Sequence, residues 1–266
     1  MSQGLYLFCL TPETSQLDLA GPGLADAPPL FTVAVAGVTA VLASVALDEF
    51  CGPAAREQLA DLAWVAPRAL RHEAVIMSIL RQAPVLPVRF GSVFSSATVL
   101  AASLERQRVA LAQFFRETAG QQEWNLKTFV DRPQAKARLL TARLAAEHAQ
   151  LAGLAPGKRY FLEQKIKGEV ERELTSWLTG VTAELLHAVN AVATASRTGR
   201  LQAAELTGRD DEMFFQAALL VPDDAVGRLH QLTAEWNASH QALGLQLASS
   251  GPWPPYHFTP VLVPPE

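Results

Sequence analysis

The sequence has few cysteines, and this scarcity argues against two kinds of site. Only Cys9 and Cys51 occur in 266 residues, and their spacing forms neither a CxxC pair nor a zinc-ligand pattern. We therefore expect reduced thiols, with no disulfide framework and no structural metal. We also expect no cofactor, because no dinucleotide-binding GxGxxG follows a strand and no GxxxxGK[ST] motif is present, and a GxSxG nucleophile motif is missing as well.

The sequence also has no excess of positively charged residues. The chain has 22 Lys and Arg against 26 Asp and Glu, for a net charge of −4, and no stripe of basic residues interleaved with aromatics. This composition argues against a nucleic-acid partner. The N-terminal residues have no basic segment and only a short apolar stretch, so we expect no signal peptide.

One stretch lacks charge altogether and has to be compared with a membrane span. From Ala27 to Leu47 there is no charged residue, and a helix of that length could cross a bilayer. The stretch is rich in valine, threonine and alanine, and Gly37 interrupts it midway. These features favour a hairpin of two buried strands, so we expect no membrane partner.

The pattern of apolar residues predicts an α+β protein with two domains. In residues 1–120, short apolar strands alternate with amphipathic helices, which predicts a mixed α/β N-terminal domain. One helix is expected to begin at Pro53 and to break at Pro67, and another to run from Ser95 or Ser96 to Gly120. The second domain is expected over 121–266.

The order of elements predicts that this second domain is ferredoxin-like. A strand over 123–130 precedes a helical region with a long helix over 158–196, whose apolar residues recur at intervals of three and four. Two strands follow, over 200–208 and 212–222, and then a helix and a last strand. The order βαββαβ is that of the modified ferredoxin-like fold, here with an expanded helical region and an aromatic, proline-rich C-terminal tail.

Arg89 stands out because it lies in the apolar run APVLPVRFGSVF, residues 83–94. A guanidinium in an apolar strand is costly unless it is paired and hydrogen-bonded. Three uses are open: an ion pair with Glu73 on the preceding helix, a clamp on a ligand carboxylate or phosphate, or a strand end where the side chain reaches solvent. We rank the structural pair with Glu73 first.

The C-terminal tail GPWPPYHFTPVLVPPE, residues 251–266, cannot form a helix or a central strand because of its prolines. Its aromatic residues Trp253, Tyr256 and Phe258 allow two interpretations. The tail can fold back over the sheet of its own domain as a lid, which we favour, or it can present an aromatic strip to a partner.

Several motifs together resemble the gas vesicle protein F and L family. The run APVLPVRFGSVF is similar to the family signature, and GLYLFCL resembles its N-terminal strand. LRHEAVI resembles the family's His-Glu helix, EWNLKTFV its Glu-Trp-x-x-Lys strand, and SGPWPPYHF its C-terminal motif. The resemblance extends over residues 4–258, with one departure in the segment LTGRDDEMFFQAALLV.

This resemblance implies a non-enzymatic accessory protein of gas vesicle assembly, located at the gas vesicle and in the cytoplasm. Its implied partners are the hydrophobic shell protein, which it would keep from aggregating or help to nucleate, and other accessory proteins. Two α+β domains are implied as well, the second ferredoxin-like. The candidate structural or interaction residues are His72, Glu73, Arg89, Phe90, Phe94, Trp124, Trp177, Trp253, Tyr256 and Phe258.

Two other functions stay open. One is a ferredoxin-like regulatory module that binds a small molecule. The other is an enzyme in which Arg89 holds an anion while His72 and Glu73 supply a base; it requires that the three side chains converge in one pocket. His72-Glu73 is not a zinc protease motif, because Ile76 stands where HExxH needs its second histidine.

Overall fold

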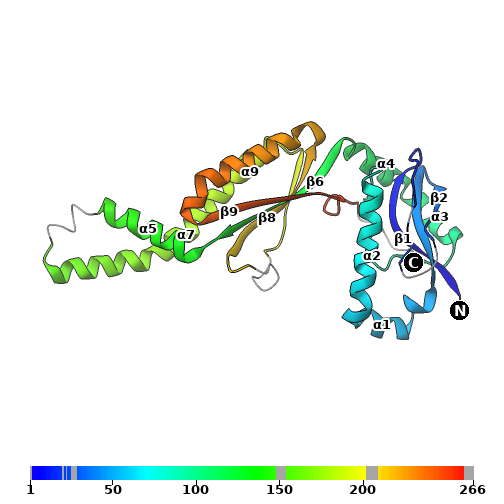
Figure 1. The fold of residues 1–266 in the computed structure, drawn as a ribbon, viewed down its shortest axis with the longest axis horizontal. Helices are drawn as coiled ribbons and strands as arrows, with labels where there is room; N and C mark the ends of the chain where they lie inside the picture. The colour runs from blue at the N-terminus through cyan, green and yellow to red at the C-terminus, as the bar shows by residue number, and fades with distance from the viewer. Residues whose placement is uncertain are drawn as a thin grey trace. The chain divides into compact units, whose positions relative to one another are not determined.

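The computed structural model describes residues 2–19, 21, 23–24, 29–147, 154–201 and 209–260. It has an α+β fold of two compact units (Figure 1). The first unit comprises Met1–Gln122 and Pro252–Glu266, and the second comprises Glu123–Gly251. This division differs from the expected ranges 1–120 and 121–266 in the C-terminal tail, which belongs to the first unit. A hydrogen bond between Tyr256 and Glu73 is one reason for this placement.

The first unit contains a five-stranded sheet in the order β2-β3-β1-β4, with β5 also paired to β1. Its strands are β1 (Gln3–Pro12), β2 (Phe31–Val35), β3 (Val38–Ala46), β4 (Leu86–Pro87) and β5 (Val93–Phe94). Every pairing in this sheet is antiparallel. Strands β2 and β3 are the hairpin expected from the uncharged stretch, and no described helix has both the length and the apolarity that a membrane span needs.

Helices cover both faces of this sheet. Tyr6 and Phe8 of β1 point to one face and pack with Ile76 of α2 (Leu62–Leu80). Leu7 and Leu10 point to the other face and pack with residues of α3 (Ala97–Arg106) and α4 (Arg108–Glu117). Side chains of a strand alternate between faces, and an irregularity in the pairing between Leu7 and Cys9 shifts this alternation by one residue. A strand covered on both sides is apolar at almost every position, as GLYLFCL is.

Two expected helix boundaries in the first unit are wrong. Pro67 does not break a helix: α1 (Pro53–Ala60) ends earlier, and Pro67 lies inside α2. The boundary is at Asp61, whose side chain accepts a hydrogen bond from the Ala63 amide and caps α2. The helix expected to reach Gly120 is divided in two at Gln107, whose backbone closes α3.

The second unit contains a four-stranded sheet in the order β7-β8-β6-β9. Its elements are β6 (Gln121–Val130), α5 (Arg132–Ala146), α7 (Pro156–Asn190), β7 (Ala195–Thr198), β8 (Glu212–Pro222), α9 (Val226–His240) and β9 (Leu245–Trp253). Counting strands along the chain, this order is 2-3-1-4, which is the ferredoxin-like arrangement. The strand expected over 200–208 differs, because β7 lies earlier and residues 202–208 fall outside the described part of the chain.

A helical hairpin of α5 and α7 enlarges the second unit and extends beyond its sheet (Figure 1). The buried residues of α7 recur every three or four positions: Ile166, Val170, Leu174, Leu178, Val181, Leu185 and Val189. Ion pairs join the two helices, since Glu171 contacts both Arg132 and Lys136, and Arg132 also contacts Glu212 of β8. Because these pairs are partly exposed, each is expected to contribute little to stability.

Candidate functional site

A chain of hydrogen bonds joins three of the sequence motifs in the first unit. His72 of α2 is buried, and its Nδ1 lies 2.9 Å from the Tyr6 hydroxyl of β1. Its Nε2 lies 3.0 Å from the carbonyl oxygen of Val88, in the loop between β4 and β5. The amide of Gly91 in the same loop donates to the Tyr6 hydroxyl at 3.1 Å. The strand, the His-Glu helix and the signature loop therefore share one polar network.

The partners fix the protonation of this network. A carbonyl oxygen can only accept, so the proton of neutral His72 lies on Nε2 and is donated to Val88. Nδ1 is then an acceptor for the Tyr6 O–H, and the Tyr6 oxygen keeps a lone pair for the Gly91 amide. Both nitrogens of the imidazole and both functions of the phenol are thus used, which is what a buried polar cluster requires.

Burial shifts the pKa values of both side chains toward their neutral forms. It lowers the pKa of His72 to about 4, although the hydrogen bond to Val88 acts in the opposite direction. It also raises the pKa of Tyr6 well above its usual value near 10. Both groups are therefore uncharged at neutral pH, as a structural network needs.

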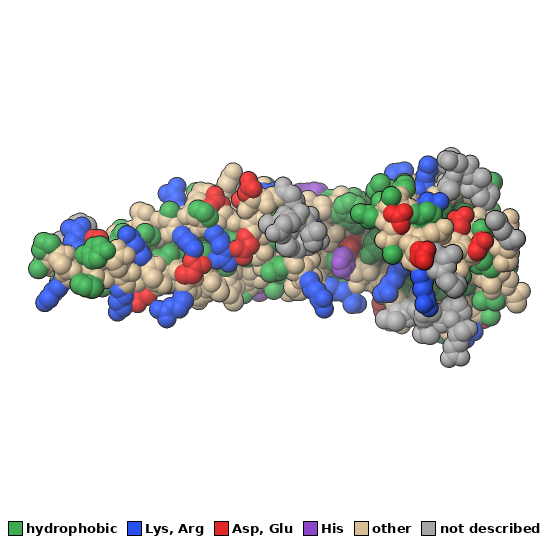
Figure 2. Space-filling view, turned by 90° about the horizontal axis from the view of Figure 1, so that it is seen from below, with side chains coloured by type: hydrophobic (Ala, Val, Ile, Leu, Met, Phe, Trp, Pro, Cys, Tyr) green, Lys and Arg blue, Asp and Glu red, His purple; other side chains and the backbone are tan. Residues whose placement is uncertain are grey.

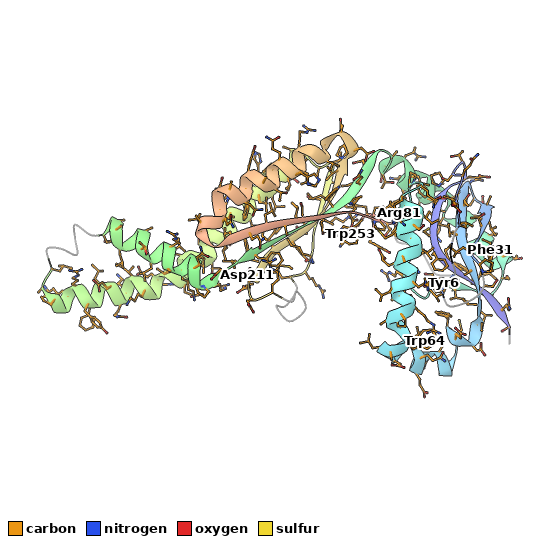
Figure 3. All side chains as sticks on the ribbon, in the orientation of Figure 1. Tyr6, Phe31, Trp64, Arg81, Asp211 and Trp253 are labelled. Carbon is orange, nitrogen blue, oxygen red and sulfur yellow. The ribbon has the colours of Figure 1, made fainter. Side chains whose placement is uncertain are left out.

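Aromatic rings surround the imidazole and close it off. Phe8 stacks on His72 with ring centroids 5.6 Å apart, and Phe90 meets it edge-on at 5.8 Å. Phe50 contacts Tyr6, Phe90 and Trp64, the last at the start of α2. Figure 3 labels Tyr6 and Trp64 on the ribbon, Tyr6 on β1 and Trp64 at the start of α2, beside α1.

The signature loop is held by backbone bonds as well. The Val88 amide donates to the Phe8 carbonyl, and the Leu7 amide donates to the Ser92 carbonyl. Between them, the Ser92 amide closes a turn onto the Arg89 carbonyl, and Gly91 adopts a φ of 84° at the third position of that turn. A residue with a side chain is disfavoured there, which accounts for the glycine in VRFG.

Glu73 joins the C-terminal tail to the same helix. The Tyr256 hydroxyl donates a hydrogen bond of 2.6 Å to Glu73 Oε2. Burial and the neighbouring Glu73 carboxylate both raise the pKa of Tyr256 above its usual value. The adjacent residues of the His-Glu pair thus have separate partners: His72 holds the signature loop, and Glu73 holds the tail.

The expected ion pair of Arg89 with Glu73 is wrong. Arg89 is exposed, and it lies in the loop after β4 rather than within a strand. The Glu73 carboxylate accepts from Tyr256 instead. Of the three uses that the sequence left open, the structure matches the third, a side chain that reaches solvent from a strand end.

The other candidate residues lie apart from this network. Phe94 of β5 pairs with Leu5 and packs on the opposite face of the sheet. In the second unit, Trp124 is buried with its ring 4.8 Å from His230, and Trp177 is partly buried among the residues under α5. Of the tail aromatics, Trp253 and Tyr256 are each 37% exposed, whereas Phe258 is half-buried.

Tyr6 is central to the network, although it is not among the candidate residues from the sequence. A tyrosine within an otherwise apolar strand is a signal for a buried hydroxyl that needs a partner. Gly251, the first residue of GPWPPY, is not among those candidates either. A Cβ at Gly251 would lie 2.9 Å from both the Glu123 carbonyl oxygen and Cδ2 of Trp124, so only glycine fits between them.

These contacts do not fit the anion site with a base that the sequence left open for His72, Glu73 and Arg89. His72 has both nitrogens occupied and is buried, and Glu73 is bonded to a phenol. Arg89 faces solvent, so the three side chains that an anion site with a base requires do not share a pocket. The network is suited to fixing the relative positions of one helix, one loop and the tail.

Comparisons with known proteins agree with the motifs. The family described as gas vesicle synthesis protein GvpL/GvpF matches residues 4–260. The chain is 26% identical over 255 residues to gas vesicle protein L of Streptomyces sp. (strain CB03234), with 95% of this chain and 91% of the relative covered.

Two crystal structures share the fold. Gas vesicle protein GvpF of Anabaena sp. PCC7120 has a TM-score of 0.71 and 19% identity, with 98% of this chain and 99% of that chain covered. GvpF of Microcystis aeruginosa has a TM-score of 0.65 and 20% identity, with 97% and 99% covered. Since the family match extends over nearly the whole sequence, the chain belongs to the gas vesicle synthesis protein GvpL/GvpF family, and this membership supports a role in gas vesicle assembly.

Proposed function

We propose that this chain binds the hydrophobic shell protein of the gas vesicle and thereby limits its aggregation or helps to nucleate the vesicle. The observation that carries the proposal is the family match over residues 4–260. The partners would be the shell protein and other gas vesicle accessory proteins, and the protein would act at the vesicle and in the cytoplasm.

Elementary physical chemistry gives such a role a reason. A wall that encloses gas needs subunits with large apolar surfaces, and these surfaces associate indiscriminately before assembly. A partner that covers them reversibly keeps the subunits available for ordered addition. Covering can occur through an apolar face or through the edge of a sheet.

Two regions of this chain are candidates for the contact, one in each unit. At the start of α7, Tyr160 is 59% exposed and Phe161 76% exposed. In the tail, Trp253 and Tyr256 expose about a third of their surface. Figure 2 shows hydrophobic side chains at the far end of the α5–α7 hairpin, beyond a surface of mixed positive and negative side chains.

The test is a sedimentation assay with purified shell protein diluted from denaturant. We expect the chain to keep the shell protein in the supernatant, and we expect the double substitution Tyr160→Ser with Phe161→Ser to reduce that effect. Val109→Ser is the matched control, because Val109 is 79% exposed on α4 and lies outside both candidate regions.

The proposal is overturned if adding the wild-type chain does not change the amount of shell protein that sediments. A regulatory binding module would then be the better interpretation if a thermal-shift screen found a small molecule that raises the melting temperature specifically. If the wild-type chain protects the shell protein and the double variant protects it equally well, binding stands but the surface on α7 is wrong.

A further inference from the structure

The second unit contains a surface hollow between α7 and α9 that the motif network does not use. Its volume is about 290 Å³. The residues that line it are Glu184, Leu185 and Ala188 from α7 and Leu232, Glu235, Trp236, Ser239 and His240 from α9. The floor is therefore apolar, and one exposed carboxylate stands on each of the two helices. In Figure 1 these helices lie beside the sheet of β6, β8 and β9.

Glu184 of α7 and Glu235 of α9 differ from several other carboxylates on α7. Glu163, Glu171 and Glu173 each form an ion pair with a Lys or Arg. Neither Glu184 nor Glu235 forms one with any residue in the described part of the chain. Glu235 Oε1 accepts a hydrogen bond of 2.7 Å from the neutral amide of Gln231, which orients the carboxylate without neutralising it.

The aromatic wall of the hollow is fixed. The His240 imidazole stacks on the Trp236 indole at 4.2 Å with an interplanar angle of 11°. His240 Nδ1 lies 2.8 Å from the Trp236 carbonyl oxygen, so Nδ1 carries a proton and donates it. In neutral His240 the Nε2 atom is then an acceptor, like the two carboxylates, and the polar atoms around the hollow favour a ligand that donates hydrogen bonds.

We propose that this hollow accepts an arginine or lysine side chain from a basic segment of another protein. The aliphatic stem of such a side chain would cover the partly exposed Ala188 and Leu232, and its charged head would lie between Glu184 and Glu235. A bound metal ion fits less well, since no group of three His, Cys, Asp or Glu side chains among the described residues could hold one. An anionic segment would meet two uncompensated carboxylates.

The test is a titration with a synthetic peptide that repeats the triplet Ala-Arg-Leu, followed by calorimetry and by NMR. We expect saturable binding that shifts the indole N–H resonance of Trp236, which the variant Trp236→Phe identifies. The double variant Glu184→Gln with Glu235→Gln is expected to weaken binding about tenfold, because each carboxylate contributes a charge-assisted hydrogen bond.

The matched control is Glu163→Gln with Glu169→Gln, which removes two carboxylate charges from the chain, as the test variant does, but leaves the hollow intact. Equal affinity of the two double variants would overturn the proposal, as would equal binding of a peptide with glutamate in place of arginine.

Ala188→Arg gives an independent readout, because it places a cation of the chain itself beside Glu184 and is expected to compete with the peptide. No gas vesicle protein takes part, so the result is separate from that of the shell-protein assay.

Discussion

At the scale of single residues, the first unit shows how a polar pair is kept inside an apolar core. His72 and Tyr6 lie among phenylalanine rings, where an unpaired polar group would cost about 1–3 kcal/mol. Each finds its partners in the other or in the backbone of the signature loop. The satisfaction of donors and acceptors thus accounts for the positions of His72 and Tyr6 within this core.

This arrangement predicts a loss of stability in acid. The pKa of His72 is about 4 in the folded chain, against about 6.5 when unfolded, so the unfolded state binds a proton first as the pH falls. Its contribution is complete above about pH 6.5 and is lost between that pH and about 4, by an amount on the order of 3 kcal/mol. Urea unfolding at several pH values measures this loss.

The control for the acid effect is a pair of histidine substitutions. His72→Gln is expected to flatten the dependence between pH 6.5 and 4, because the amide does not titrate in this range. His187→Gln, at an exposed position of α7, is expected to keep it. If the difference between wild type and His72→Gln does not change with pH, the buried neutral imidazole is the wrong explanation.

Gly251 gives a second prediction at this scale. Gly251→Ala places a Cβ at 2.9 Å from the Glu123 carbonyl oxygen and from the Trp124 ring, with a φ of 155° that a side chain disfavours. We expect the free energy of unfolding to fall by about 1–3 kcal/mol. Gly180→Ala is the matched control: a Cβ there meets nothing within 4 Å, and alanine in a helix is expected to raise stability by about 0.5–1 kcal/mol. Equal effects in thermal unfolding would contradict the steric argument.

Arg89 shows where single-residue inference from sequence stops. The run VLPVRFGSVF is apolar on both sides of the arginine, and it suggests one strand with a buried cation. The structure has two strands of two residues each, with a turn between them that turns Arg89 to solvent. The sequence contains the signal for the turn in Gly91, but a glycine alone does not reveal where the side chain two residues earlier will point.

At the scale of secondary-structure elements, the β2–β3 hairpin has the two-residue turn that suits the twist of paired strands. Ala36 and Gly37 have φ values of 57° and 78°, and strand pairing closes directly at Val35 and Val38. Two consecutive positive φ values are typical of a type I′ turn, where Asn-Gly is preferred. Ala36 therefore occupies a position that its side chain disfavours.

Ala36→Asn is expected to stabilise the first unit by about 0.5–1 kcal/mol, because asparagine tolerates the left-handed conformation. The same substitution two residues earlier, Ala34→Asn, is expected to destabilise it by a similar amount, since Ala34 is an exposed position within β2. Urea unfolding of the two variants measures both signs. Two effects of the same sign would show that the turn conformation does not decide the result.

Elements with a strong period could be predicted from the sequence, and elements that depend on a cap could not. The hairpin, the order of strands in the second unit and the existence of the long helix are confirmed, because apolar spacing records which face is buried. The expected end of that helix at residue 196 is wrong, since α7 ends at Asn190 and β7 begins at Ala195. The sequence also predicts the break between α1 and α2 at Pro67, whereas the structure has it at Asp61. A proline within a helix is disfavoured but not excluded, and the capping aspartate is the more local signal.

At the scale of the whole molecule, residues that are far apart in the sequence meet in the first unit. Tyr6, His72 and Gly91 share the network, and Tyr256 arrives from the far end of the described chain to bond Glu73. Motif order along the sequence could not reveal this meeting, because hydrogen bonds between distant residues leave no periodic signal. The sequence therefore favours a tail that folds over the sheet of the second domain, whereas the structure assigns the tail to the first unit.

The tail contact gives the last prediction. Tyr256→Phe removes the hydroxyl that donates to Glu73, a hydrogen bond to a charged acceptor, while leaving the ring in place. We expect the amides of Trp253 and of residues 256–259 to exchange with solvent about fivefold faster, which corresponds to about 1 kcal/mol. Tyr160→Phe, which removes a more exposed hydroxyl on α7, is expected to leave that exchange unchanged. If Tyr256→Phe has no more effect than Tyr160→Phe, the tail is held by its prolines and aromatic rings, and the Glu73 carboxylate contributes nothing to its placement.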